Sequence, residues 1–313
     1  MDLSSRSRLG TAVAAALLAL GLAGCTSTGT AAGPASGGRT AASTRAADGY
    51  QRYVALGDSY SAGPLIPTTD LAGGCARSDH NYPSLLAARL HVGRFVDVTC
   101  SGATTGDLSH VQHPFRGASV PPQLHAVTRH TDLVTVGIGG NDLDLFGTLI
   151  TTCTRLRSGD PSGSPCGRQL SRHGPDLGAA TATISARVAA ALRAVHRRAP
   201  RATVVLVGYL RLVPDRGTCA DLPLAVGDYP VGRRISRALD RALSRAASRA
   251  GALYVDMYAD SAGHDICSAH PWVNGAVTDR TRALAYHPLA AGMRADAAEV
   301  LATLRRSPGG LPR

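Results

Sequence analysis

Three short motifs of the sequence each follow an apolar run. Ser59 ends a Gly-Asp-Ser turn, Gly102 follows a second run, and Asn141 lies in Gly-Gly-Asn-Asp after a third. A serine hydroxyl just past a buried strand can attack a carbonyl carbon once a base takes its proton. The backbone N–H groups of Ser59 and Gly102 and the side-chain amide of Asn141 could stabilise the negative charge that acyl transfer places on oxygen. These residue types therefore predict a serine nucleophile with an oxyanion hole, although Gly-Asp-Ser alone also fits a simple helix N-cap.

The serine needs a general base, and the chain has eleven histidines. We expect His287 to be the base, because Tyr-His-Pro lies between an irregular stretch and the last expected helix. His270, also followed by proline, is the alternative. His110 and His113 lie three residues apart, as metal ligands can, but without a third ligand nearby they are typical of a solvated loop. We expect no metal and no cofactor.

The elements that must position these residues alternate in type. Short apolar runs typical of strands alternate with longer stretches at helical spacing. Such a pattern implies a parallel sheet covered on both faces, with ligands bound beyond the carboxyl ends of its strands. The expected strands are 52–56, 94–99, 132–136, 203–207 and 252–256, and the expected helices are 82–91, 176–199, 231–250 and 288–304. Residues 147–174 and 260–285 are expected to be long loops over the edge that carries the site.

In these motifs the chain resembles the SGNH (GDSL-type) hydrolases. Their blocks Gly-Asp-Ser, an isolated Gly and Gly-x-Asn-Asp match residues 57–59, Gly102 and residues 139–142. The elbow of the α/β-hydrolases, Gly-x-Ser-x-Gly, does not occur in the sequence. The resemblance spans nearly all of residues 49–313. It implies a three-layer α/β/α sandwich with a five-stranded parallel, flavodoxin-like sheet, Ser59 and His287 as catalytic residues, and an oxyanion hole of Ser59, Gly102 and Asn141.

The chain departs from the family three residues before the expected base. The family usually has Asp there, whereas this chain has Leu284. A main-chain carbonyl, most simply that of Leu284 itself, could accept the Nδ1–H of His287 and fix its tautomer. Secreted actinobacterial lipases of this family are similar, with a Ser–His dyad and a carbonyl in place of the acid. The alternative is that Asp265 or Asp279 reaches His287 from the preceding loop.

Three further residues lie close to these motifs. Asp58 and Asp142 belong to the matching blocks, and we expect them to cap helix starts or brace loops. Trp272 either lines an acyl pocket or covers an edge of the core.

The first residues have the features of an export signal. Two arginines precede the apolar run Leu9–Gly24, which is too short and too rich in alanine and glycine for a comfortable membrane span, so residues 1–24 are expected to be a lipoprotein-type signal peptide. Leu22–Cys25 resembles the bacterial lipobox, so we expect Cys25 to be acylated; the alternative is an ordinary signal peptide cut further along. Residues 25–48 are expected to be a flexible tether before a single domain, residues 49–313. The expected location is the outer face of the cytoplasmic membrane, with some release from the anchor.

The cysteine count agrees with this interpretation. Seven cysteines would leave one unpaired thiol, but a lipid on Cys25 leaves six. No Cys-x-x-Cys occurs, so three disulfides are expected in an exported chain, with fifteen possible pairings. The resemblance to the actinobacterial lipases implies the pairs Cys75–Cys100, Cys153–Cys166 and Cys219–Cys267.

The chain is basic, with a net charge of +11, and its basic residues are all arginine. Such a surface can help at anionic lipids. The lack of a basic, aromatic-interleaved cluster argues against nucleic acid. We expect a monomeric serine ester hydrolase that acts on ester or lipid substrates. The alternatives are a carbohydrate O-deacetylase of the same family and a catalytically inactive lipid-anchored binding protein.

Overall fold

The structure, a computed structural model, describes residues 49–307 of the chain. The predicted signal segment, the lipid-bearing Cys25 and the tether lie outside the described residues. Within residues 49–307, none of the helices has the length and apolar character needed to cross a membrane.

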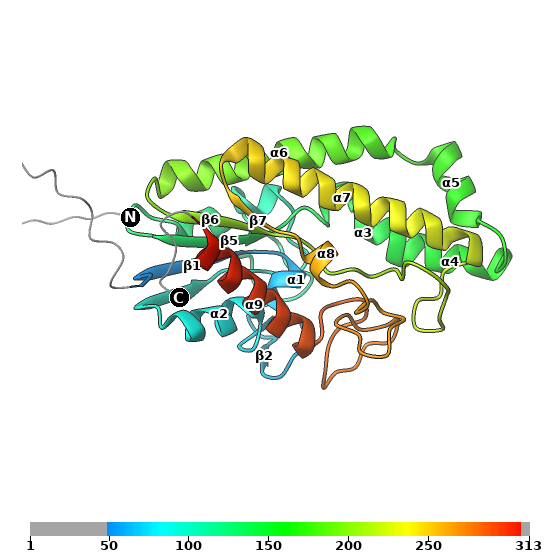
Figure 1. The fold of residues 1–313 in the computed structure, drawn as a ribbon, viewed down its shortest axis with the longest axis horizontal. Coiled ribbons are helices and arrows are strands. Elements are labelled where there is room, and N and C mark those ends of the chain that lie inside the picture. The colour runs from blue at the N-terminus through cyan, green and yellow to red at the C-terminus, as the bar shows by residue number, and fades with distance from the viewer. Residues whose placement is uncertain (1–48, 308–313) are drawn as a thin grey trace, which may run out of the picture. The chain divides into compact units, whose positions relative to one another are not determined.

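Five parallel strands form the central sheet in the order β4-β1-β5-β6-β7 (Figure 1). The three inner strands are almost wholly buried, which explains why they are near-continuous apolar runs in the sequence. This sheet confirms the predicted α/β fold. In sheet order the strands are β4 (Arg94–Asp97), β1 (Arg52–Gly57), β5 (Leu133–Gly137), β6 (Thr203–Val207) and β7 (Leu253–Val255).

Two pairs of long helices cover the sheet, one pair on each face (Figure 1). Helices α6 (Leu177–Arg198) and α7 (Tyr229–Ala250) pack against each other, as do α2 (Tyr82–Leu90) and α9 (Ala290–Arg306). The face of α7 that holds Ile235, Leu239 and Leu243 is buried, as its helical spacing predicted. The three layers confirm the predicted sandwich.

The pairing of β1 with β5 sets the start of the candidate site. In this register Gly57 lies opposite Gly137, so both strands end at the same level. The Asp58 N–H then donates to the Gly137 carbonyl at 2.9 Å. The segments that follow the two strands, which carry Ser59 and Asn141, therefore leave the sheet side by side.

The expectation of a long loop over residues 147–174 is wrong, because this stretch is largely helical. The start of its last helix is capped by a distant side chain: the Asp228 carboxylate accepts from the N–H groups of Cys166 and Gly167, both at 2.9 Å. A disulfide from Cys153 to Cys166 ties the helices together. The cap and the disulfide stabilise the start of α5 and its link to the helices before it. The helices of this stretch are α3 (Leu145–Gly147), the π-helix η4 (Thr148–Cys153), α4 (Thr154–Leu156), the 3₁₀-helix η5 (Arg157–Gly159) and α5 (Pro165–His173).

The second expected loop, residues 260–285, is irregular as predicted. After α8 (Met257–Asp260), only isolated bridges occur before α9, and the disulfide Cys219–Cys267 ties this stretch to the segment after β6. The remaining short elements are α1 (Ser59–Ala62), β2 (Thr69–Asp70), β3 (Arg77–Ser78), η1 (Gly106–Leu108), η2 (Gln123–Ala126), η3 (Asp142–Asp144) and η6 (Val226–Asp228).

Candidate active site

Ser59 is the first residue of α1, directly beyond the carboxyl end of β1. The Asp58 side chain caps this short helix, since its Oδ1 atom accepts from the Tyr60 N–H at 2.9 Å. The N-cap is therefore Asp58 and not Ser59, whose hydroxyl is free for another partner. Ser59 is 7% exposed, so its hydroxyl lies in a largely dehydrated pocket.

The partner of this hydroxyl is His287, which arrives from the irregular stretch before α9. The His287 Nε2 and Ser59 Oγ atoms are 2.8 Å apart, within hydrogen-bond distance. Of the two histidines weighed as base, the structure brings His287 to the serine. His270 is exposed, and its main-chain carbonyl oxygen lies 2.8 Å from the His264 Nδ1 atom.

The other ring nitrogen of His287 faces a main-chain oxygen. The Nδ1 atom lies 2.7 Å from the carbonyl oxygen of Ala285. The expectation that Leu284 supplies this oxygen is therefore wrong by one residue. Tyr286 adopts a left-handed turn with φ of 62°, which folds the Ala285 carbonyl back toward the ring. The Leu284 oxygen instead accepts from the His287 N–H at 3.2 Å and from Asn274.

The two aspartates that could have served as the acid, Asp265 and Asp279, are hydrogen-bonded to groups other than the His287 ring. Asp265 Oδ1 accepts from the Cys267 N–H, and Asp279 Oδ1 accepts from both the N–H and the hydroxyl of Thr281. Among residues 49–307, no carboxylate is hydrogen-bonded to the His287 ring. The structure thus contains a Ser–His pair held by a carbonyl.

Burial governs the charge of this histidine. It lowers the pKa of His287 below the ordinary value, while the hydrogen bond to Ala285 raises it in part. With Nδ1–H donated to the carbonyl, the neutral ring keeps its lone pair on Nε2, facing Ser59. This is the tautomer that a general base requires.

Gly102 follows β4 in a left-handed conformation, with φ of 80°, which favours glycine. A Cβ atom built at this position would meet no atom within 4 Å, so the backbone here borders open space. Within the described part of the chain, the N–H groups of Ser59 and Gly102 have no hydrogen-bond acceptor. The Asn141 amide donates to the Ala103 carbonyl at 2.9 Å, which ties the loop after β5 to the loop after β4.

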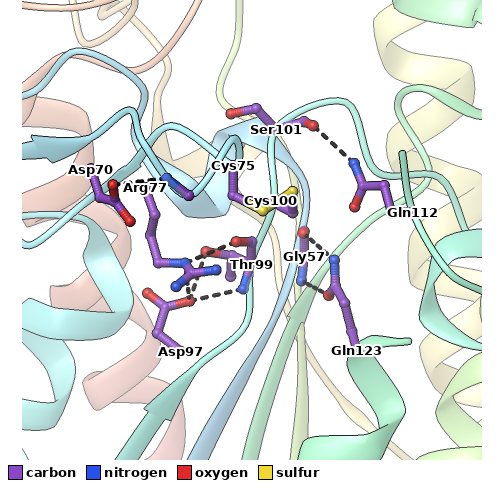
Figure 2. The surroundings of a disulfide bond; sticks show 11 residues. Gly57, Asp70, Cys75, Arg77, Asp97, Thr99, Cys100, Ser101, Gln112 and Gln123 are labelled. Atoms are coloured by element: carbon purple, nitrogen blue, oxygen red, sulfur yellow. Dashed lines mark hydrogen bonds and ion pairs between the residues drawn. A yellow bond between two sulfur atoms is a disulfide. The ribbon is translucent and has the colours of Figure 1, made fainter. Parts of the chain in front are cut away.

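Figure 2 shows how the loop before Gly102 is anchored. The disulfide Cys75–Cys100 joins it to the segment after β2, and the Ser101 N–H donates to the Cys75 carbonyl at 3.0 Å. The Gln112 amide holds the Ser101 carbonyl, also at 3.0 Å. One covalent bond and two hydrogen bonds therefore fix the main chain that leads into Gly102.

A buried glutamine braces the turn before Ser59 in a similar way. The Gln123 side chain accepts from the Gly57 N–H at 2.8 Å and donates to the Gly57 carbonyl at 2.9 Å (Figure 2). Asp142 joins the loop after β5 to the loop after β4: it accepts from the N–H and hydroxyl of Thr105 at 2.9 and 2.5 Å, and from Arg187 at 3.3 Å. Asp58 and Asp142 thus cap and brace, as their positions in the motifs predicted.

A cavity of about 40 Å³ lies beside Ser59, and its walls are largely apolar. Trp272 is not among its lining residues; its ring stacks on His264 instead, with centroids 4.0 Å apart. No motif marks the apolar lining residues in the sequence, and Ile150 lies in the stretch expected to be a loop. The lining residues are Asp58, Ser59, Tyr60, Asn141, Phe146, Ile150, Leu212, Tyr286 and His287.

The two histidines considered as metal ligands have separate contacts. His110 Nδ1 lies 3.0 Å from the Gly106 carbonyl oxygen, and His113 Nδ1 lies 2.7 Å from the Ser119 hydroxyl. Within residues 49–307, no cluster of three or more His, Cys, Asp or Glu side chains could hold a metal ion. The three disulfides are the pairs that the resemblance to actinobacterial lipases implies.

Comparison with known proteins agrees with this geometry. Residues 55–295 match the GDSL-like Lipase/Acylhydrolase family. Lipase 2 of Streptomyces coelicolor is 40% identical over 224 residues, which are 69% of this chain and 73% of that protein. A lipase of Streptomyces rimosus is 36% identical over 242 residues, covering 77% of this chain and 81% of that protein.

Two solved structures share the fold. The extracellular lipase from Streptomyces rimosus superimposes with a TM-score of 0.66 and 32% identity over 81% of this chain and 99% of that chain. Phospholipase A1 from Streptomyces albidoflavus does so with a TM-score of 0.65 and 30% identity over the same shares. By motif, fold and similarity, the chain belongs to the GDSL-like lipase/acylhydrolase family and is a carboxylic ester hydrolase.

Proposed function

We propose that this protein cleaves carboxylic esters of acyl lipids through an acyl-enzyme on Ser59, with His287 as general base. The observation that carries this proposal is the 2.8 Å contact between Ser59 Oγ and His287 Nε2, with the opposite nitrogen held by the Ala285 carbonyl. The similar lipases and the phospholipase A1 favour lipid esters as substrates. The largely apolar walls beside Ser59 fit an acyl chain better than a polysaccharide.

In the first half of the reaction, Ser59 Oγ attacks the ester carbonyl carbon while His287 Nε2 takes the hydroxyl proton. The carbonyl π electrons move to oxygen, and the N–H groups of Ser59 and Gly102 and the amide of Asn141 stabilise that charge. When the intermediate collapses, the bond to the alcohol oxygen breaks, and His287 returns its proton to the leaving alcohol. The acyl group is then esterified to Ser59.

In the second half, His287 takes a proton from water, whose oxygen attacks the acyl carbon. Collapse breaks the bond to Ser59 Oγ, which regains a proton from His287, and the free acid leaves. The Ala285 carbonyl keeps the reactive tautomer throughout. In serine proteases, replacing the triad Asp by Asn costs roughly 10⁴ in rate because the tautomer is wrong. A carbonyl avoids that loss and forgoes part of the stabilisation of the imidazolium.

The test of this function compares labelling and turnover. The wild type should react with a fluorophosphonate probe at Ser59 and hydrolyse nitrophenyl esters. Ser59→Ala should lose both, with turnover reduced by about 10⁴-fold or more and an unchanged circular dichroism spectrum. A wild type that neither reacts with the probe nor hydrolyses esters would favour the inactive binding protein. Acetylated polysaccharide hydrolysed faster than any lipid ester would favour the deacetylase.

We also propose that the protein is exported and lipid-anchored through Cys25. Three disulfides are typical of oxidising compartments, and a similar lipase is described as extracellular. Metabolic labelling with a palmitate analogue should tag the wild type at the membrane and not Cys25→Ser. Equal labelling of both chains, or of neither, would contradict the anchor and leave the hydrolase assignment untouched.

A further inference from the structure

Tyr209 lies two residues beyond β6, at the same edge of the sheet as the catalytic loops. It is buried, and its hydroxyl contacts two of those loops at once. The hydroxyl donates to Asp58 Oδ2 and accepts from the Gly140 N–H at 2.8 Å. Tyr209 does not line the cavity beside Ser59, so it contacts no reacting atom.

The first contact acts on the turn that carries the nucleophile. The Asp58 Oδ1 atom accepts from the Tyr60 N–H, and the Asp58 main-chain N–H donates to the Gly137 carbonyl. Asp58 therefore fixes the main chain on both sides of Ser59. The Tyr209 hydroxyl occupies the remaining carboxylate oxygen. The orientation of this carboxylate, and with it the start of α1, therefore depends on Tyr209.

The second contact acts on the loop that carries Asn141. Gly140 immediately precedes Asn141, and its N–H is held by the Tyr209 hydroxyl. A Cβ atom at position 140 would lie 2.9 Å from the Tyr209 ring and 2.5 Å from the Phe146 ring, so glycine permits this close approach. The Phe146 ring also packs edge-on against Tyr209, with centroids 4.9 Å apart.

We propose that Tyr209 is a positioning residue that holds the Ser59 turn and the Asn141 loop at a fixed separation. This inference rests on the proposed acyl-enzyme mechanism. Without the hydroxyl, the buried Asp58 oxygen and the Gly140 N–H would both lack a partner and would move to find one. The nucleophile and an oxyanion donor would then shift relative to each other, and misplacement by about 1 Å can cost 10²-fold in rate.

The test uses Tyr209→Phe, which removes a single oxygen atom. We expect kcat to fall by about 10- to 100-fold while KM changes by less than about threefold, because the cavity walls remain. The matched control is Tyr254→Phe. This change removes a hydroxyl that donates to Asp240 Oδ1 at 2.6 Å, and Tyr254 does not line the cavity beside Ser59. Its kcat should stay within about twofold of the wild type. The melting temperatures of the two variants should lie within about 5 °C of each other, so that lost stability does not explain lost turnover.

A double-mutant cycle tests the coupling itself. If Tyr209 acts through Asp58, the losses of kcat in Tyr209→Phe and Asp58→Asn should not add in the double variant. Additive losses, or a Tyr209→Phe kcat within about twofold of the Tyr254→Phe control, would overturn the proposal. Fluorophosphonate labelling separates this outcome from failure of the mechanism: Tyr209→Phe should still be labelled at Ser59, more slowly. Wild-type labelling at another residue would instead overturn the Ser59 assignment.

Discussion

The Nδ1 atom of His287 lies 2.7 Å from the main-chain oxygen of Ala285, where serine hydrolases commonly have a carboxylate. This oxygen belongs to the backbone, so its position depends on the path of the loop and not on the side chain at 285. The turn at Tyr286 is fixed at two points: its carbonyl accepts from the Tyr60 hydroxyl at 2.7 Å, and its N–H donates to Gly275 at 3.0 Å. The orientation of the base is therefore set by the hydrogen bonds that hold the main chain of this loop.

This relationship predicts how substitutions around the base will behave. His287→Ala should reduce kcat nearly as much as Ser59→Ala, since the two residues act as one unit. Leu284→Ala should change kcat by less than about threefold, because its side chain supplies no catalytic group. Steady-state kinetics on a nitrophenyl ester will measure both. A loss in Leu284→Ala comparable to that in His287→Ala, in a folded protein, would contradict the backbone-held dyad.

The lowered pKa of His287 predicts the acid limb of the pH profile. The base must be neutral to take the Ser59 proton, so kcat/KM should fall as the pH drops through the pKa of His287. Burial places that pKa below the ordinary value of about 6.5, so activity should persist below pH 6.5. Burial also raises the pKa of Asp58 to about 7, so this carboxyl titrates close to the same pH range. The profile should therefore be recorded in Asp58→Asn as well, where this group no longer titrates. An acid limb of kcat/KM whose midpoint lies above pH 6.5 in Asp58→Asn would contradict its assignment to His287.

The disulfide Cys75–Cys100 should affect turnover as well as stability. Replacing both cysteines by serine opens a loop with ends 25 residues apart and should cost about 3.5 kcal/mol in the free energy of unfolding. It should also lower kcat, because the bond anchors the segment that leads into Gly102. The control replaces Cys153 and Cys166, whose bond joins helices within residues 148–173 and is not joined to the loops of Ser59, Gly102 or His287. Equal kcat in both double variants, measured well below their melting temperatures, would argue against an anchoring role.

Phe146 should limit the length of acyl chain that the site accepts. Phe146 and Leu212 line the cavity beside Ser59 and also a second small cavity bounded by Leu239 and Tyr258. Phe146→Ala should join the two spaces and raise kcat/KM for long-chain nitrophenyl esters relative to short-chain ones by several-fold, on the order of 1 kcal/mol. Leu145→Ala is the control, because Leu145 lines a different cavity between α5, α6 and α7. An identical chain-length profile in both variants would show that the chain takes another path.

The parts of the site that could be predicted from sequence are those with a local signal. Ser59, Gly102 and Asn141 each follow a recognisable strand, and parallel strands bring such residues to one edge of the sheet. Tyr209 also follows a strand, but a lone tyrosine has no motif, and its role arises from contacts with Asp58 and Gly140.

Other features depended on three-dimensional contacts. The helices within residues 145–173 form where Asp228 caps α5 and a disulfide closes the segment, and neither leaves a periodic pattern in the local sequence. The choice of Ala285 over Leu284 depends on the backbone torsion of Tyr286, which sequence spacing does not encode.

The Cys75–Cys100 bond has a consequence for where in the cell the protein can work. Thiols stay reduced in the cytosol, so a chain still inside the cell would lack this tie to the loop of Gly102. If the protein is exported as proposed, it would gain its full hydrolytic capacity only after crossing the membrane. The cell's own esters would then be spared during synthesis.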